Sequence, residues 1–260
     1  LKLRPKMRGA ISLRSIRCNL CGRPLSVMAA SGPTVTARTG EAGCIPGTGS
    51  ISESKVALRK TMRATLKGLN DAALASQSQA VCDRLTDLPW YQESNTIGLF
   101  LSMPSGELRT EPILRHAFAA GKRVFCPRVM GDGWMEMLEV RDVDDALSLP
   151  LSKWKIPEPP PGRPRVEPVD LDLLLVPAVA LDLARRRCGH GKGFYDRYIV
   201  RARDGSRKAV FRAVGLGLDE QRLETVPCED HDVILDGVLF PSDSALSSAE
   251  DVQSPVQDCE

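Results

Sequence analysis

Residues 172–202 read DLLLVPAVALDLARRRCGHGKGFYDRYIVRA, and they place a strand, a loop and a helix in direct succession. The apolar run over 172–176 predicts a buried strand. A polar, glycine-bearing loop follows it, and residues 194–202 predict a helix. A strand, a loop and a helix in this order form the repeating unit of an α/β sheet domain.

Helical patterns also precede this unit. A helix is expected from Ser52 and a second over residues 72–88. A third begins where Thr110 caps the chain and Pro112 occupies the first turn, and Gly121 ends it. In the first of these helices the apolar residues recur at helical spacing, and the basic residues fall on other sides. The apolar set is Val56, Met62, Leu66 and Leu69, and the basic set is Lys55, Arg59, Lys60 and Arg63.

Short apolar runs predict further strands over residues 96–101, 123–126, 134–140, 213–218 and 233–240. The segment 157–168 contains six prolines, so we expect an extended loop there. Strands that alternate with helices predict a single α/β domain over residues 53–241, with a mostly parallel central sheet flanked by helices. We expect residues 1–52 to be a disordered leader or presequence, and residues 242–260 to be a disordered tail.

The net charge of +2, from 35 basic and 33 acidic residues among 260, hides an uneven distribution. The first 40 residues hold eight basic side chains and no acidic one, which leaves 27 basic and 33 acidic side chains, a net charge of −6, for residues 41–260. A mildly acidic domain argues against a nucleic-acid binder, whose affinity comes from basic surface. No run of 18 uncharged apolar residues occurs, so we expect no membrane span.

The Arg-rich, acid-poor start is typical of an organellar presequence. We therefore expect a mitochondrial protein if this leader is translated, and a cytoplasmic one if translation starts at Met28. The eight cysteines show no disulfide framework, which indicates reduced thiols. Cys18 and Cys21 form a C-x-x-C without a second pair, and chance explains it better than a metal site.

The chemistry is expected in the loop over residues 187–196. Its alternating glycines expose backbone N–H groups, and the start of the following helix adds a positive dipole end, so the loop favours anions. Arg187 and Lys192 add fixed positive charge, and Asp196 offers an oxygen suited to Mg²⁺. The spacing matches neither a P-loop nor a dinucleotide fingerprint. A structural turn is the alternative interpretation, and these three side chains favour a phosphate site.

This loop, R-x-G-x-G-K-G-[FY]-Y-D-x-Y, resembles the signature of the 5-formyltetrahydrofolate cyclo-ligase family, also called 5,10-methenyltetrahydrofolate synthetases. Further stretches match in the family's order over residues 55–240. They are Lys55 with Arg59, Phe100-Leu101-Ser102-Met103, Thr110-Glu111, Pro127-Arg128, Met135-Glu136-Met137, Trp154 through Pro159, Val226-Pro227 and His231-Asp232.

The resemblance implies an ATP- and Mg²⁺-dependent enzyme that closes 5-formyltetrahydrofolate to 5,10-methenyltetrahydrofolate and releases ADP and phosphate. It implies that ATP phosphorylates the formyl oxygen, because this oxygen is a poor leaving group, and that the neighbouring amine then attacks the activated carbon. Positioning and charge neutralisation are what such a phosphoryl transfer needs. The family also suggests a monomer whose partners are small molecules alone.

By this resemblance, each part of the reaction has its residues. Lys192, Arg187 and Glu107 are the catalytic candidates, with Glu107 orienting the amine. Asp196 and Asp232 are the metal candidates. ATP is assigned to Lys55, Arg59, Arg187, Gly189, His190, Gly191, Lys192, Gly193, Phe194 and Tyr195, and the folate to Leu101, Met103, Glu107, Trp154, His190, Lys192 and Phe194.

Several alternatives remain open at this point. In these alternatives Lys55 and Arg59 belong to the solvated face of a helix and Trp154 packs in the core. Glu107 is then a loop residue before Thr110, and Asp232 is an ordinary acid that flanks a strand. A homologue that binds folate or nucleotide without turnover is the second hypothesis for the whole chain. An RNA-associated relative is a third, but the chain lacks the aromatic signature of an RNA-recognition domain. The sequence departs from the family pattern at Arg185, where a glycine is usual, at Cys188, where an aliphatic is, and at His190.

Overall fold

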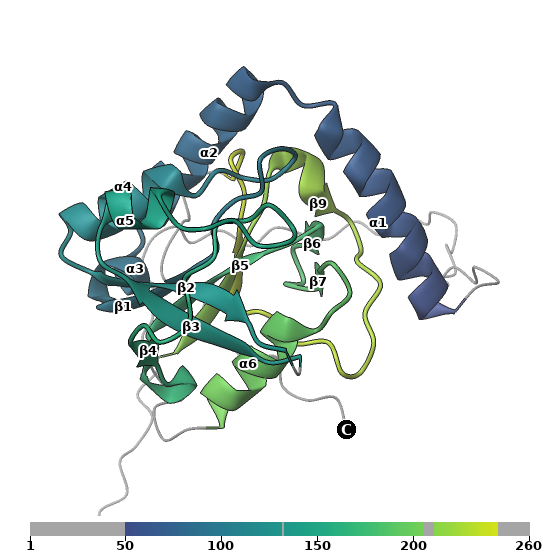
Figure 1. Ribbon diagram of the computed structural model, residues 1–260. Coiled ribbons are helices and arrows are strands. Elements are labelled where there is room, and N and C mark those ends of the chain that lie inside the picture. Colours follow the sequence, from purple (N-terminus) through teal and green to yellow (C-terminus); the bar gives the residue numbers. More distant parts are fainter. Residues whose placement is uncertain (1–49, 132, 205–210, 244–260) are drawn as a thin grey trace, which may run out of the picture. The chain divides into compact units, whose positions relative to one another are not determined.

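The computed structural model describes residues 50–131, 133–204 and 211–243 (Figure 1). The predicted leader, apart from its last residues 50–52, therefore lies outside the described residues, as do Cys18, Cys21 and the predicted tail beyond residue 243. In the described part, no helix is both long and apolar enough to cross a membrane. Its cysteines, Cys82, Cys126, Cys188 and Cys228, form no disulfide.

A seven-stranded sheet forms the centre of the fold, in the order β10-β8-β5-β1-β2-β3-β4. The strands from β10 to β2 run parallel, whereas β3 and β4 pair antiparallel to their neighbours at one edge. The mostly parallel sheet predicted from the sequence is therefore confirmed. Its strands are β1 (Thr96–Leu99), β2 (Arg123–Val129), β3 (Met135–Val140), β4 (Arg165–Val166), β5 (Leu173–Pro177), β8 (Arg212–Leu216) and β10 (Gly237–Leu239).

Helices cover both faces of this sheet, which explains why the central strand β5 is apolar without alternation. Leu173 and Leu175 pack in one hydrophobic cluster with α2 and α4, while Leu174 and Val176 pack in another with α6. The helices are α1 (Ile51–Lys67), α2 (Asp71–Thr86), α3 (Pro89–Glu93), α4 (Glu111–Ala119), α5 (Val143–Leu147) and α6 (Phe194–Arg203), with short 3₁₀ turns at Pro168–Asp170 and Asp219–Gln221.

Helix α1 begins with a capping box between Ser50 and Glu53, which explains its sharp start. Its predicted apolar side is partly wrong. Met62 is buried as expected, but Val56 is 61% exposed, and Lys55 is buried with only 5% of its surface accessible. Long-range pairing of the Lys55 ammonium, described below, overrides the local hydrophobic pattern.

Other differences from the predicted elements are local. Thr110 precedes α4, but its hydroxyl makes no capping bond and instead lies 3.1 Å from the Ser102 hydroxyl. The strand expected over 233–240 is shorter and consists of β10 alone. The proline-rich segment 157–168 is the expected loop, except that it contains the two-residue strand β4 and that its last residue begins a short 3₁₀ turn.

A small second sheet, in the order β7-β6-β9, was not predicted because its strands are too short to show a pattern. It contains β6 (Ala180–Asp182), β7 (Arg187–Cys188) and β9 (Arg222–Leu223). This sheet places the start of the glycine-rich loop beside the carboxyl end of β5.

The turn between β6 and β7 contains one strained residue. Arg185 has a φ of 66°, in the left-handed region that glycine adopts without strain. Its N–H donates to the Asp182 carbonyl at 2.9 Å, and its carbonyl accepts from the Leu235 N–H at 3.1 Å, so the surrounding backbone holds it there. The neighbouring Arg186 pairs with the fully buried Asp182 carboxylate at 2.7 Å.

We expect Arg185→Gly to raise the free energy of unfolding by about 0.5–1 kcal/mol, because relief of the left-handed strain exceeds the added entropy of the unfolded chain. Arg186→Ala, one position away, should instead lower it by roughly 1–2 kcal/mol, because Asp182 loses its ion-pair partner. Chemical denaturation of the two variants measures both effects. A less stable Arg185→Gly protein would contradict this interpretation of the turn.

Candidate functional site

The loop between β7 and α6 is held against α1 by backbone and arginine contacts. Arg59 Nε donates to the Gly189 carbonyl at 2.7 Å. Gly191 and Gly193 have φ angles of 88° and 65°, and a Cβ at Gly191 would lie 3.1 Å from the Arg59 guanidinium carbon. Glycine is therefore required both for the backbone conformation and for the close approach of α1.

Arg187 connects the beginning of the loop to the first turn of α6. Its Nη2 donates to both carboxylate oxygens of Asp196, at 2.9 and 2.8 Å, and its guanidinium lies 5.8 Å from the centre of the Tyr195 ring. The side chain is buried, and its Nε has no hydrogen-bond partner among the described residues. Arg187 was predicted as a phosphate ligand, and the structure places it on the predicted metal ligand Asp196.

Lys55 joins the beginning of the domain to its end. Its Nζ donates to Glu229 Oε2 at 2.6 Å and forms a second ion pair with Asp232. Burial lowers the pKa of Lys55, but the bonds to Asp232 and Glu229 outweigh it, so its pKa is raised. Burial likewise raises the pKa of Asp232, and the Lys55 bond outweighs this, so the Asp232 pKa is lowered. The interpretation of Lys55 as a solvated helix residue is therefore wrong.

The two predicted metal carboxylates lie close to the same backbone segment. Asp196 Oδ1 accepts from the Val233 N–H at 3.4 Å, directly after Asp232 in the chain. Ligand atoms of Glu229, His231 and Asp232 also lie within 4.8 Å of one another. Carboxylate oxygens are the ligands that Mg²⁺ prefers, so Glu229 and Asp232 fit a magnesium site, whereas Asp196 is not part of this group and both its oxygens pair with Arg187. Sequence reasoning missed Glu229, although it lies three residues before Asp232.

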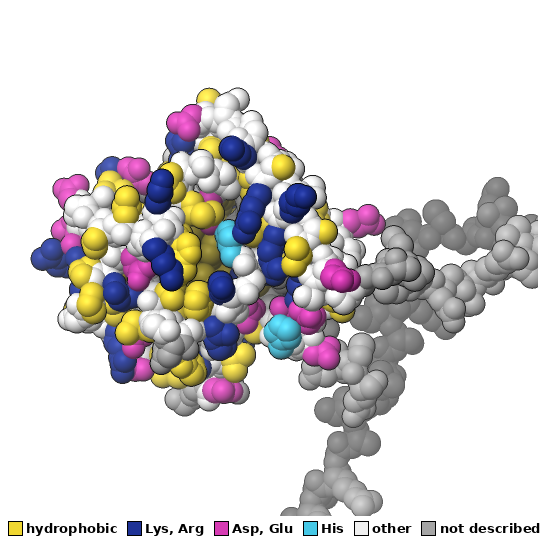
Figure 2. All heavy atoms as spheres, turned by 45° about the vertical axis from the view of Figure 1, so that its right-hand side comes forward, with side chains coloured by type: hydrophobic (Ala, Val, Ile, Leu, Met, Phe, Trp, Pro, Cys, Tyr) yellow, Lys and Arg dark blue, Asp and Glu magenta, His cyan; other side chains and the backbone are white. Residues whose placement is uncertain are grey.

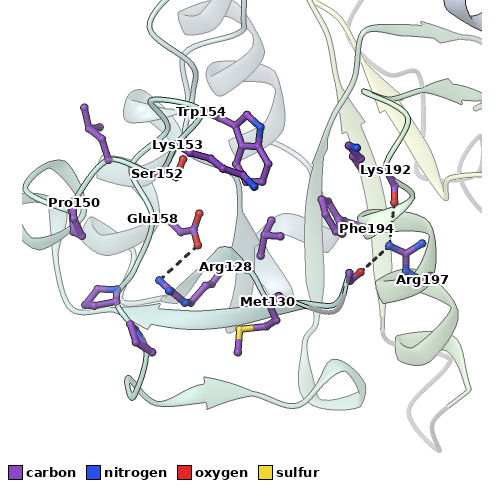
Figure 3. A pocket seen from close by; sticks show the side chains of 16 residues that line it. Arg128, Met130, Pro150, Ser152, Lys153, Trp154, Glu158, Lys192, Phe194 and Arg197 are labelled. Carbon is purple, nitrogen blue, oxygen red and sulfur yellow. Dashed lines mark hydrogen bonds and ion pairs between the residues drawn. The ribbon is translucent and has the colours of Figure 1, made fainter.

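A cavity of about 760 Å³ opens beside the loop (Figure 3). Residues 150–161 form one wall, the turn between β2 and β3 another, and the start of α6 a third. Trp154, which is 44% exposed, lies across the cavity from Lys192 and Phe194, so the core-packing alternative for this tryptophan is wrong. Arg197 fixes the third wall by donating to the carbonyls of Gly133 and Lys192 at 2.7 and 3.0 Å.

Basic side chains border the loop on its α1 side. Figure 2 shows Lys and Arg gathered along α1, next to a hollow in this face of the molecule. His190 is exposed at the loop, where partial desolvation and the neighbouring charges of Arg63, Arg187 and Arg59 lower its pKa. Arg59 and Arg63 therefore form a positive border on which an anion would be stabilised, while the lowered pKa of His190 favours its neutral form.

Glu107 is a buried carboxyl group near the loop. It accepts a hydrogen bond from the Met103 N–H at 2.7 Å, and burial raises its pKa to about 7 despite this bond. Burial and then the charge of Glu107 raise the pKa of Tyr195, which indicates that the two side chains are neighbours. Leu101 packs in the hydrophobic core rather than lining the cavity, and neither Met103 nor Glu107 is among the described residues that line it.

Comparisons with known proteins agree on one family. The sequence model of the 5-formyltetrahydrofolate cyclo-ligase family matches residues 51–241. A probable 5-formyltetrahydrofolate cyclo-ligase of Caenorhabditis elegans is 34% identical over 75% of this chain and 97% of its own. The mitochondrial 5-formyltetrahydrofolate cyclo-ligase of Arabidopsis thaliana is 27% identical over 74% of this chain and 76% of its own.

A solved structure shows the same fold. The 5,10-methenyltetrahydrofolate synthetase of Aquifex aeolicus superposes with a TM-score of 0.61 at 26% identity, over 73% of this chain and 90% of that one.

We expect the burial of Glu107 to make stability pH-dependent. Its pKa of about 7 lies above the ordinary value of 4.5, so the protonated carboxyl stabilises the fold fully below pH 4.5, and this contribution is lost as the pH rises to 7. The unfolding free energy of the wild type, relative to Glu107→Gln, should fall by roughly 3 kcal/mol across this interval and stay level above it. Denaturation at several pH values measures it. The exposed Glu224→Gln is the control, and a pH-independent Glu107→Gln difference would refute the prediction.

Proposed function

Because the chain belongs to the 5-formyltetrahydrofolate cyclo-ligase family, a family of enzymes, we propose that it closes 5-formyltetrahydrofolate to 5,10-methenyltetrahydrofolate in a reaction that converts ATP into ADP and phosphate. The observation that supports this most is the contact of α1 with the glycine-rich loop, through Arg59 and the Gly189 carbonyl at 2.7 Å. This contact gathers cations from two distant parts of the chain around one loop, as an anionic triphosphate requires.

The proposed reaction has two steps, phosphorylation of the formyl oxygen and closure of the ring. The formyl oxygen attacks the γ-phosphorus, a C–O–P linkage forms and ADP leaves. The neighbouring amine nitrogen then bonds to the formyl carbon, the C–O bond breaks, phosphate departs and the amine proton is lost. Lys192 and Arg59, with the exposed backbone N–H groups of the loop, would hold the phosphates in line for the first step.

Asp232 would hold Mg²⁺ through a carboxylate oxygen. Asp196, which accepts from the Val233 N–H next to Asp232, would join it only after the loop repacks and frees one of its oxygens from Arg187. When bound, the metal would neutralise phosphate charge. Arg187 would act here as a positioning residue, because it fixes both oxygens of Asp196.

The folate would occupy the cavity between Trp154 and Phe194, whose flat side chains suit a ring system. Glu107 has a pKa of about 7 and is therefore suited to exchange a proton near neutral pH. Because Glu107 does not line the cavity, the reacting end of the folate would extend beyond it toward Glu107, which would then orient the amine and accept its proton when the ring closes. His190 would face the phosphates from the α1 border.

The test follows the absorbance of methenyltetrahydrofolate after protein, ATP, Mg²⁺ and 5-formyltetrahydrofolate are mixed. We expect an increase that requires both ATP and Mg²⁺. Folded protein that binds folate or nucleotide but gives no increase would instead support the alternative function, a binding homologue without turnover.

Lys192 gives the sharpest single-residue test of this function. Its side chain is exposed beside the loop and makes no hydrogen bond or ion pair with the described residues, so its removal should leave the fold intact. We expect Lys192→Ala to lower kcat at least 100-fold, since the charge acts on the transferring phosphate. Lys67→Ala, at the far end of α1, is the matched control. Near-normal turnover by Lys192→Ala would show that the phosphates bind elsewhere.

The compartment follows from the start of translation. We propose a mitochondrial location if residues 1–52 are translated, in line with the mitochondrial relative in Arabidopsis, and a cytoplasmic one otherwise. N-terminal sequencing of the native protein distinguishes these.

A further inference from the structure

Lys55 occupies one of the two carboxylate oxygens that Asp232 offers to the proposed metal site. Its ammonium pairs with Asp232 through Oδ2, and the same oxygen accepts the Glu229 N–H at 2.7 Å. The second partner, Glu229, lies 2.6 Å from Nζ. The Lys55 side chain is only 6% exposed, so water cannot easily replace these carboxylates as its partners.

The corresponding cation on Asp196 is fixed in place. Arg187 bonds to both Asp196 oxygens, lies over Tyr195 and packs on Gly189, where a Cβ would come within 2.5 Å of its Nη1. The guanidinium therefore cannot leave without repacking of the loop. The Lys55 ammonium, in contrast, ends a flexible four-carbon chain and can move by rotation of its side chain alone.

Two cations cannot share the Asp232 carboxylate without strong repulsion. A metal ion that arrives alone on Oδ1 would meet the charge of the ammonium on Oδ2, or would displace Lys55 and leave its buried ammonium short of a partner. A triphosphate, which Arg59 and the loop would bind one helical turn away, offers the ammonium a new anionic partner.

We propose that Lys55 blocks Asp232 against metal in the nucleotide-free protein and passes to the phosphates when metal and nucleotide bind together. This inference rests on the proposed function, because it assumes Mg²⁺ at Asp232 and ATP at the loop. It adds that the enzyme does not load its metal before its nucleotide. Glu229 acts as the positioning residue that holds Lys55 beside Asp232.

The test measures binding of Mn²⁺ alone to nucleotide-free protein, from the electron paramagnetic resonance signal of unbound Mn²⁺. We expect Lys55→Met to bind Mn²⁺ at least tenfold more tightly than the wild type. Lys60→Met is the matched control, since it removes the same charge from an exposed position on the same helix. Its affinity should stay within twofold of the wild type.

Each other outcome overturns the proposal. Equal affinity in Lys55→Met and the wild type means that Lys55 does not compete with the metal. An equal gain in Lys60→Met means that only the overall charge matters. A gain that persists in Lys55→Met with Asp232→Asn places the metal elsewhere. If Lys55→Met does not fold, as circular dichroism would reveal, Lys55→Gln provides the same test while keeping two N–H donors for the carboxylates.

A separate measurement shows whether the proposed function itself is wrong. Wild-type protein that binds no ATP in the presence of Mg²⁺, measured by calorimetry, would refute the ATP site. The Mn²⁺ affinities of the Lys55 variants would still decide whether Lys55 competes for Asp232.

Discussion

Burial of β5 on both faces is the constraint on which the arrangement of this domain depends. Its alternate side chains lie in two separate hydrophobic clusters, so no polar group can be placed along the strand itself. Charged residues must collect beyond its end, where the small sheet and the glycine-rich loop follow. Ligand sites of open α/β sheets lie at the carboxyl ends of the strands for this reason. The candidate site is therefore a consequence of how the core is divided.

Local patterns were sufficient to predict the class of fold and most of its elements. The short apolar runs that became β1 and β5 and the helical pattern of α6 are visible in the local sequence, so no tertiary information was needed. The two-residue strands of the small sheet carry none, and only their pairing defines them. Burial of Lys55 was equally unpredictable from α1 alone, because its partners lie 174 and 177 residues further along the chain.

For the candidate site, the sequence indicated which residues gather but not which of them pair. Arg187, Lys192 and Asp196 were predicted from one loop; the structure joins Arg187 to Asp196 and leaves Lys192 exposed beside the cavity. Which of the two cations, Arg187 or Lys192, is free to bind a ligand depends on burial and on hydrogen bonds that only the folded structure shows. Burial and two bonds to Asp196 make Arg187 a structural cation, while the exposed Lys192 stays accessible to a ligand. Residue types alone do not distinguish a cation that holds a carboxylate from one that awaits a phosphate.

The pairing of Lys55 with Glu229 and Asp232 also constrains when the site can exist during synthesis. Domains fold as units as the chain leaves the ribosome, and contacts between distant segments form only after both are available. Helix α1, the first helix of the described residues, must wait for residues 229–232, which lie close to the end of the described part of the chain. A nascent chain truncated before this segment would contain the central strands β1, β2 and β5 but would lack both carboxylates that pair with the buried Lys55 ammonium.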